Sequence, residues 1–144
     1  MIDKDLFKKR FIIKGGDYTA AGEVSVEIKN ILKDIGFDPV VIRRLAIASY
    51  EAEMNLIMYG VEGELQLTVN PDTIHLVIAD TGPGIEDIDR AMQEGYSTAT
   101  DEMREMGFGA GMGLPNIRKN SDEFKITSDI DKGTRLEITI HCHS

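Results

Sequence analysis

The sequence has a single cysteine, no tryptophan and no long apolar run. Cys142 stands alone among the 144 residues, so an internal disulfide is excluded and a reducing cytoplasm is the expected compartment. Apolar runs such as 40–42 are soon broken by charge, which excludes the stretch of about 20 apolar residues that a membrane-spanning helix needs. Residues 1–5 lack the apolar stretch of a secretion signal. We therefore expect a cytoplasmic protein without membrane association.

Basic residues are also scarce. The chain has 16 lysines and arginines against 25 aspartates and glutamates, and its formal net charge is −9. This acidic balance argues against direct binding of nucleic acid, which needs a basic face. It does not exclude a nucleotide ligand, because a single phosphate site depends on local backbone N–H groups, a helix N-terminus and a metal ion rather than on total charge.

The sequence does contain enough apolar material for one core. It is 42% hydrophobic and 28% charged, which is the composition of a globular chain. Its length fits one domain, since domains most often have about 100–150 residues. We expect residues 1–144 to form a single domain.

Periodicity and turn signals predict the order of the elements. Asp38 followed by Pro39 is typical of a helix start, and Gly36 is typical of a helix end. The patterns predict strands over 8–14, 64–70, 73–79, 123–128 and 134–141, helices over 18–35, 39–59, 86–94 and from 111–113 to 120, and a loop over 95–110. Because the helices are grouped between hairpins, the expected fold class is α+β: a two-layer sandwich with a mixed, mostly antiparallel sheet and its helices on one face.

The first cluster with chemical character is Glu51-Ala52-Glu53-Met54-Asn55. Glu51 and Asn55 are four residues apart, so they project from the same helical face. A carboxylate in this place can orient or deprotonate a nucleophile, and an amide carbonyl can bind a hard cation. A solvated polar face with an ordinary i,i+4 contact has the same pattern and remains the alternative.

Two segments with glycine follow. In the first, Asp80 leads into Thr81-Gly82-Pro83-Gly84 after a strand, so its carboxylate can accept a hydrogen bond from an exocyclic amine such as that of adenine. In the second, four glycines alternate with other residues from Gly107 to Gly113 at a helix start, which lets backbone N–H groups turn toward an anion. An ordinary turn and a flexible linker are the plainer alternatives. The second segment is neither a P-loop nor a dinucleotide-binding turn, because it lacks Gly-Lys-Ser/Thr and follows no first βα unit.

In this order the segments resemble the boxes of the GHKL ATPases, the family with the Bergerat nucleotide fold. That family has Glu-x-x-x-Asn on a helix, then Asp-x-Gly-x-Gly, then Gly-x-Gly-x-Gly-Leu at a helix start, and a Gly-Thr pair before the last strand. The matching residues here are Glu51 and Asn55, then Asp80, Gly82 and Gly84, then Gly109, Gly111, Gly113 and Leu114, and finally Gly133 and Thr134. The chain looks most like the stand-alone anti-sigma-factor serine kinases of bacterial stress and sporulation control.

The resemblance implies ATP and Mg as cofactors and a role for each matching residue. Asn55 would bind Mg, Asp80 would hold the adenine amine, and Thr134 would help at the adenine end. Glu51 would be the general base. The glycines of the two boxes, with Gly107 and Leu114, would wrap the ring and the phosphates. Arg104 is the candidate cation for the γ-phosphate, and a plain surface arginine is the alternative reading of it.

The implied activity is a protein-serine kinase that moves the γ-phosphate of ATP to a small anti-anti-sigma (STAS-type) or sigma-factor-like partner. A catalytically weak module that uses ATP to order a lid and capture a partner is the alternative. The catalytic half of a histidine kinase is disfavoured, because none of His75, His141 and His143 fits a phospho-accepting histidine on a dimerising helix. The resemblance also suggests homodimers, and the apolar strand around Phe11-Ile12-Ile13 is either a contact surface or core.

Overall fold

The computed structural model describes residues 6–82, 84, 88–93, 113–129 and 132–142. Its strands are β1 (Phe7–Lys14), β2 (Glu62–Val69), β3 (Thr73–Asp80), β4 (Glu123–Asp129) and β5 (Gly133–His141). Its helices are η1 (Tyr18–Ala20), α1 (Glu23–Ile35), α2 (Pro39–Tyr59), α3 (Ile88–Ala91) and α5 (Gly113–Lys119). The expected helix over 86–94 thus corresponds to α3, whereas the expected loop over 95–110 lies outside the described residues.

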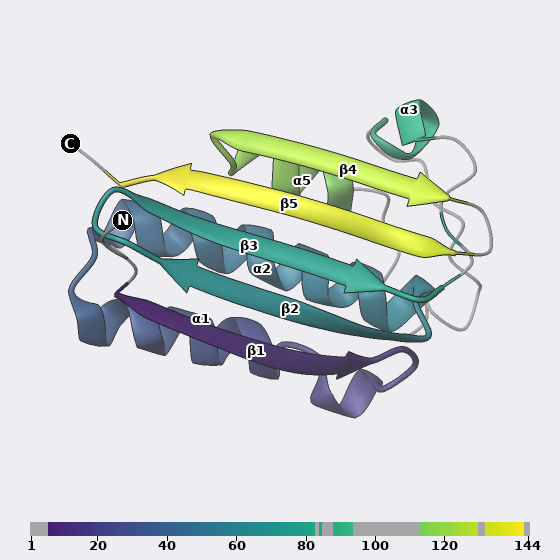
Figure 1. Ribbon diagram of the computed structural model, residues 1–144, viewed down its shortest axis with the longest axis horizontal. Helices are drawn as coiled ribbons and strands as arrows, with labels where there is room; N and C mark the ends of the chain where they lie inside the picture. Colours follow the sequence, from purple (N-terminus) through teal and green to yellow (C-terminus); the bar gives the residue numbers. More distant parts are fainter. Residues whose placement is uncertain (1–5, 83, 85–87, 94–112, 130–131, 143–144) are drawn as a thin grey trace, which may run out of the picture.

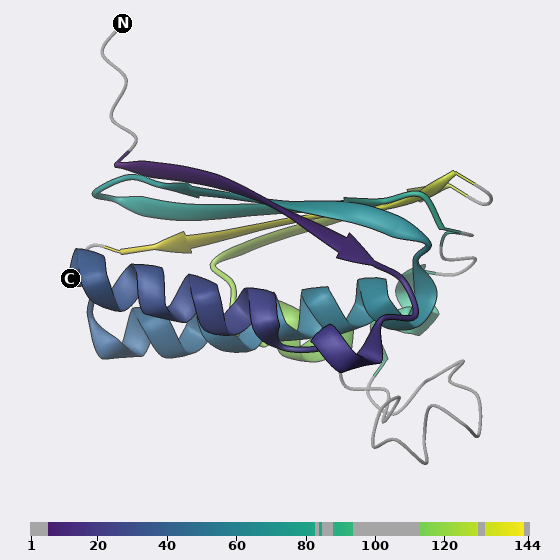
Figure 2. The same ribbon diagram turned by 90° about the horizontal axis from the view of Figure 1, so that it is seen from below.

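The five strands form one sheet in the order β1-β2-β3-β5-β4, and α1, α2 and α5 cover one face of it (Figures 1 and 2). The expected two-layer α+β sandwich is therefore confirmed. All four pairings between the described strands are antiparallel, so this part of the chain has none of the parallel pairs of a mixed sheet. The chain passes through two helices between β1 and β2, and it reverses direction at each connection between successive elements. The path from β1 through α1 and α2 to β2 therefore has three reversals, and an odd number of reversals leaves β2 antiparallel to β1.

The first helix begins later than the sequence predicts. Gly22 has a φ of +91° at the N-cap of α1, and this left-handed residue separates η1 from the helix. The carboxylate of Glu53, on α2, accepts hydrogen bonds from the backbone N–H groups of Gly22 (3.1 Å), Val24 (3.3 Å) and Ser25 (3.1 Å). A side chain about thirty residues away in sequence thus satisfies the free N–H groups of the first turn. Local patterns could not reveal this cap.

The core lies between the sheet and the helices. The strands contribute Phe11, Ile13, Leu65, Leu67, Val69, Ile74, Leu76, Ile78, Leu136, Ile138 and Ile140, and the helices contribute Ile28, Leu32, Leu45, Leu56, Ile57 and Ile117 among others. Because side chains alternate along a strand, Ile12 points away from its two buried neighbours and is 60% exposed. Two residues of the apolar tripeptide in β1 therefore belong to the core, and the middle one lies on the opposite face of the sheet.

None of the described helices covers that opposite face (Figures 1 and 2). The alternation along the strands places five basic and four acidic described side chains on it: Lys8, Arg10, Lys14, Lys125, Arg135, Glu62, Glu64, Glu123 and Glu137. Positive and negative groups are nearly balanced here, although the whole chain has a net charge of −9. The acidic excess of the protein therefore lies elsewhere.

Asp122 ties the second layer to the end of the sheet. It accepts hydrogen bonds from the backbone N–H of His141 (2.7 Å) and from two guanidinium nitrogens of Arg44 on α2 (3.1 and 3.3 Å). The backbone N–H of His141 first, and then Arg44, hold the pKa of Asp122 below its ordinary value.

We expect Asp122→Asn to lower the free energy of unfolding at pH 7 by about 1 kcal/mol, because the charge-assisted bonds weaken. The lowered pKa means that this contribution is present above the ordinary aspartate value and is lost as the pH falls through the folded-state pKa. The difference between the two proteins should therefore shrink in acid. Urea unfolding at pH 7 and pH 3 measures it, with the exposed Asp34→Asn on α1 as the matched control. If the difference in free energy of unfolding between the wild type and Asp122→Asn grew in acid, the lowered pKa of Asp122 would be contradicted.

Candidate functional site

Helix α2 presents a polar face toward the end of the sheet where β3 stops. Glu51, Asn55 and Tyr59 are spaced four residues apart, so they lie on one side of the helix. The helical rise of about 1.5 Å per residue puts Glu51 ~13 Å from Gly60, at the end of the helix. The face is thus an elongated one, with a carboxylate at one end and the C-terminus of α2 at the other.

Glu51 lies against the start of α5. A Cβ built on Gly113, the first residue of α5, would be 3.2 Å from Glu51 Oε2. The absence of a side chain at Gly113 therefore lets the beginning of α5 approach the carboxylate closely. Burial raises the pKa of Glu51, whose side chain is half-buried. A carboxylate with a raised pKa is a stronger proton acceptor than a solvated one, which suits a general base.

Asp80 is held at the other end of this face by two backbone donors. Its Oδ1 accepts hydrogen bonds from the N–H groups of Gly82 and Thr134, each at 3.0 Å. Its Oδ2 lies near Gly60, where a Cβ would be 3.2 Å away. Because both bonds fix Oδ1, the orientation of the carboxylate is set and Oδ2 is left as the oxygen that can accept from a ligand amine.

Three glycines make room for Asp80. A Cβ on Gly133 would overlap the backbone carbonyl of Asp80, and Gly133 also has a φ of +109°. A Cβ on Gly82 would be 2.9 Å from the Cα of Gly60, closer than real Cβ contacts. The turns after α2, after β3 and before β5 therefore meet around one carboxylate, which only glycine at these places permits.

The backbone of Thr134 lies beside Asp80. Thr134 is 8% exposed, its N–H bonds to Asp80, and its hydroxyl lies 2.9 Å from the hydroxyl of Ser128. Two hydroxyl groups thus extend the polar set at this end of the site. Direct binding of a ligand by the Thr134 hydroxyl stays a prediction.

The arrangement fits a nucleoside triphosphate with a metal ion. Asp80 offers an amine acceptor at one end, α5 begins at the other, and Asn55 lies between them on α2, half-buried. Within the described residues no group of three His, Cys, Asp or Glu side chains can hold a metal. A Mg ion here would rely on the Asn55 carbonyl, on waters and on the phosphates, which is the usual way Mg binds with a nucleotide.

Residues 40–144 match the model of one family, described as histidine kinase-, DNA gyrase B- and HSP90-like ATPases. This match spans α2, the sheet from β2 onward and every part of the site just described. The chain belongs to this ATPase family. The resemblance found in the three boxes is thereby confirmed, and ATP is the nucleotide that the family binds.

Two relatives of known name are similar over most of this ATPase. The serine/threonine-protein kinase RsbT of Bacillus subtilis (strain 168) is 30% identical over 113 residues, covering 76% of this chain and 79% of RsbT. The anti-sigma F factor of Thermoanaerobacter sp. (strain X514) is 32% identical over 109 residues, covering 71% of this chain and 73% of the factor. These names support the expected class, an anti-sigma regulatory protein-serine kinase.

A solved structure shares the fold. The structure of the SiaB–SiaC complex from Pseudomonas aeruginosa contains a chain that aligns with a TM-score of 0.62 at 14% identity, covering 95% of this ATPase and 90% of that chain. At this identity the match concerns the fold alone. Among the described residues, no helix is both long enough and apolar enough to cross a membrane.

Not every predicted site residue of this ATPase can be located. Arg104, Gly107, Gly109 and Gly111 lie outside the described residues, so their roles stay predictions. Gly84 has a φ of +81°, which favours glycine in the turn after Asp80. Leu114, the second residue of α5, is 7% exposed and packs in the core, and its predicted contact with the nucleotide also stays a prediction.

Sequence reasoning missed two residues that shape the site. Tyr59 follows Asn55 by four residues on α2, a spacing that could have found it, and its backbone carbonyl oxygen would be 3.0 Å from a Cβ on Gly82, in the turn after Asp80. Gly60 is the C-cap of α2, and its missing side chain leaves room for Asp80. The contact depends on β3 and α2 meeting in three dimensions, which no local pattern indicates.

Proposed function

We propose that this protein is an anti-sigma-type protein-serine kinase that transfers the γ-phosphate of ATP to a serine of a small partner protein. The observation that carries the proposal is the proximity of the half-buried Glu51 carboxylate to Gly113, the first residue of α5. The partner would be an anti-anti-sigma protein of the STAS type or a sigma-factor-like protein. The chain would act in the cytoplasm, as a homodimer.

In the transfer, Glu51 accepts the proton of the serine hydroxyl while the serine oxygen bonds to the γ-phosphorus. The bond from the γ-phosphorus to the β,γ-bridging oxygen breaks, and ADP leaves with that oxygen. Asp80 Oδ2 accepts a hydrogen bond from the adenine amine and fixes the base end of ATP, while Gly113 and the preceding glycines approach the phosphates. Bound Mg, held by Asn55, would neutralise phosphate charge.

The proposal is tested by incubating the purified chain with Mg, labelled ATP and a candidate partner that has a serine at its regulatory position. We expect the label on that serine, and none when the serine is changed to alanine. Capture of the partner in an ATP-dependent complex, without any labelled serine, would overturn the kinase and favour the alternative, a switch module that only binds.

Replacing Asp80 with asparagine should weaken ATP binding about 30-fold, a loss of about 2 kcal/mol. If the amide oxygen keeps the two backbone N–H bonds of Oδ1, the amide nitrogen takes the place of Oδ2 and meets the adenine amine donor to donor. For a nucleotide whose purine has an oxygen in place of that amine, Asp80→Asn should lose much less affinity relative to the wild type. Isothermal titration with both nucleotides measures this, and Asp72→Asn at the opposite end of β3 is the matched control. Equal losses for both purines would contradict the assigned contact.

A further inference from the structure

The turn between β1 and η1 meets the C-terminal end of α2 with almost no space between the two backbones. A Cβ built on Gly15 would be 1.9 Å from the carbonyl oxygen of Gly60 and 3.0 Å from that of Val61. Carbon atoms normally stay about 3.3 Å or more from a carbonyl oxygen. The φ of Gly15 lies outside the left-handed region, so it is the closeness of Gly60, rather than the backbone conformation, that requires glycine here.

Two backbone hydrogen bonds hold this turn in place. The N–H of Gly15 donates to the carbonyl of Val61 at 2.8 Å, and the N–H of Gly16 donates to the carbonyl of Ile57 at 2.7 Å. The turn cannot lift away from α2 without the loss of these bonds. A methyl group on residue 15 would therefore have to displace the Gly60 carbonyl, by roughly 1.4 Å if the contact is to reach an ordinary length.

Gly60 has little free space on the side of the nucleotide site. A Cβ on it would be 3.2 Å from Asp80 Oδ2 and 2.9 Å from the carbonyl oxygen of Leu56. Gly60 thus approaches Gly15 with its carbonyl group and the Asp80 carboxylate with its Cα. Because Oδ2 is the oxygen that is left to accept from a ligand amine, a displaced Gly60 would disturb that acceptor.

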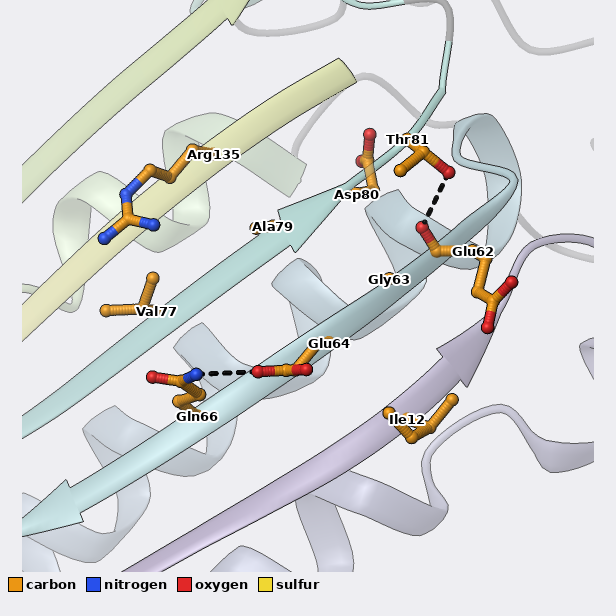
Figure 3. A pocket seen from close by; sticks show the side chains of 10 residues that line it. All are labelled: Ile12, Glu62, Gly63, Glu64, Gln66, Val77, Ala79, Asp80, Thr81 and Arg135. Carbon is orange, nitrogen blue, oxygen red and sulfur yellow. Dashed lines mark hydrogen bonds between the residues drawn. The ribbon is translucent and has the colours of Figure 1, made fainter. Parts of the chain in front are cut away.

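The chain that follows Gly60 is tied to Asp80 along a second path. Figure 3 looks into a hollow on the sheet face that no described helix covers, with Glu62, Asp80 and Thr81 in its lining. The carbonyl of Glu62 accepts from both the N–H (2.9 Å) and the hydroxyl (3.2 Å) of Thr81. Thr81 directly follows Asp80, so a shift of the chain at Gly60 also reaches the end of β3 through Glu62.

We propose that Gly15 is a positioning residue for ATP: from behind Gly60, it fixes the place where Asp80 Oδ2 meets the adenine amine. This role rests on the Asp80 contact of the proposed function, but it requires no phosphate transfer. A chain that binds ATP without acting as a kinase would leave it intact. A glycine with a purely structural role would affect stability alone, whereas a positioning residue also affects the affinity for the base.

A double-mutant cycle on ATP binding, measured by isothermal titration, tests the role. We expect Gly15→Ala to weaken ATP binding about 10-fold in the wild-type chain and less than about 2-fold in the Asp80→Asn chain, where the contact that it disturbs is already lost. Gly36→Ala is the matched control, because a Cβ there meets nothing within 4 Å while a φ of +102° strains alanine. It should lower the melting temperature and leave both affinities unchanged.

The possible outcomes separate this role from the proposed function. Unchanged ATP affinity in Gly15→Ala would overturn the positioning role and leave the Asp80 contact standing. Equal losses in both backgrounds would overturn the effect through Asp80, and the role with it. If Asp80→Asn alone bound ATP as tightly as the wild type, the proposed base contact would fail, and nothing would remain for Gly15 to position.

Amide hydrogen exchange of the unmodified chain, followed by NMR, decides the question if Gly15→Ala does not fold. Because coupling between two sites is reciprocal, ATP held by Asp80 should steady the turn behind it. We expect Mg-ATP to slow exchange at the Gly15 and Gly16 amides about 10-fold and to leave the Gly36 amide, at the C-cap of α1, unchanged. Turn amides that gained no more protection than that of Gly36 would overturn the role.

Discussion

Replacing Glu51 with glutamine is expected to reduce phosphate transfer about 1,000-fold while ATP still binds. The amide has nearly the shape of the carboxylate, so the approach of α5 at Gly113 is preserved, but it cannot accept the serine proton. Single-turnover transfer with labelled ATP measures the loss, and isothermal titration measures binding. The exposed Glu62→Gln on β2 is the matched control and should transfer at the wild-type rate. Transfer within a few-fold of wild type would show that Glu51 is not the base.

The same variant should be more stable than the wild type near neutral pH. Burial raises the pKa of Glu51, so in the folded state the ionised carboxylate is disfavoured relative to the unfolded chain. This penalty is present above the folded-state pKa and disappears as the pH falls toward the ordinary glutamate value. Melting temperatures at pH 7 and pH 5 should therefore differ between the two proteins mainly at pH 7. Loss of activity together with a gain in stability identifies a functional carboxylate rather than a structural one.

Local patterns were sufficient for most of the fold. The alternation of β5, with Leu136, Ile138 and Ile140 buried, and the start of α2 at Pro39 after Asp38 are signals contained in short stretches of sequence. The Asp38 side chain accepts from the N–H of Val40 at 2.8 Å, as an N-cap should. The same reasoning placed the start of α1 too early, because Gly22 ends the 3₁₀ turn and the cap comes from another helix.

In the candidate site, too, local patterns predict some features and not others. Glu51 and Asn55 share a face because residues four apart lie on one side of a helix. The alternation of apolar residues along β3 predicts that Asp80 lies at the end of that strand. The orientation of Asp80 depends instead on Gly82 and Thr134, which come from two separate turns. The family box selects Glu51 as the base, but no local pattern predicts that Glu53, an acidic residue in the same helix, caps α1. Their surroundings differ only once α1 and α5 have packed on opposite sides of α2.

Glu53 is the site of the largest expected loss of stability. Its side chain is 1% exposed, and its two oxygens accept from the three N–H groups at the start of α1. Burial raises the pKa of Glu53, and the hydrogen bonds from Ser25, Val24 and Gly22 act against that rise. Removal of the carboxylate leaves three donors without their acceptor in a place that water reaches poorly. The cost of such unsatisfied groups is about 1–3 kcal/mol each in buried positions.

We expect Glu53→Ala to lower the free energy of unfolding by about 3 kcal/mol or more, and Glu53→Gln to lower it by less, because one acceptor oxygen remains. Urea unfolding measures both, with Glu62→Ala as the exposed control. Hydrogen exchange at the amides of Val24 and Ser25 should speed up before that of the sheet, since the start of α1 loses its cap. At temperatures where Glu53→Ala stays folded, its transfer rate should remain near wild type, unlike that of Glu51→Gln. A stable Glu53→Ala with impaired transfer would instead place Glu53 in the chemistry and remove it from the fold.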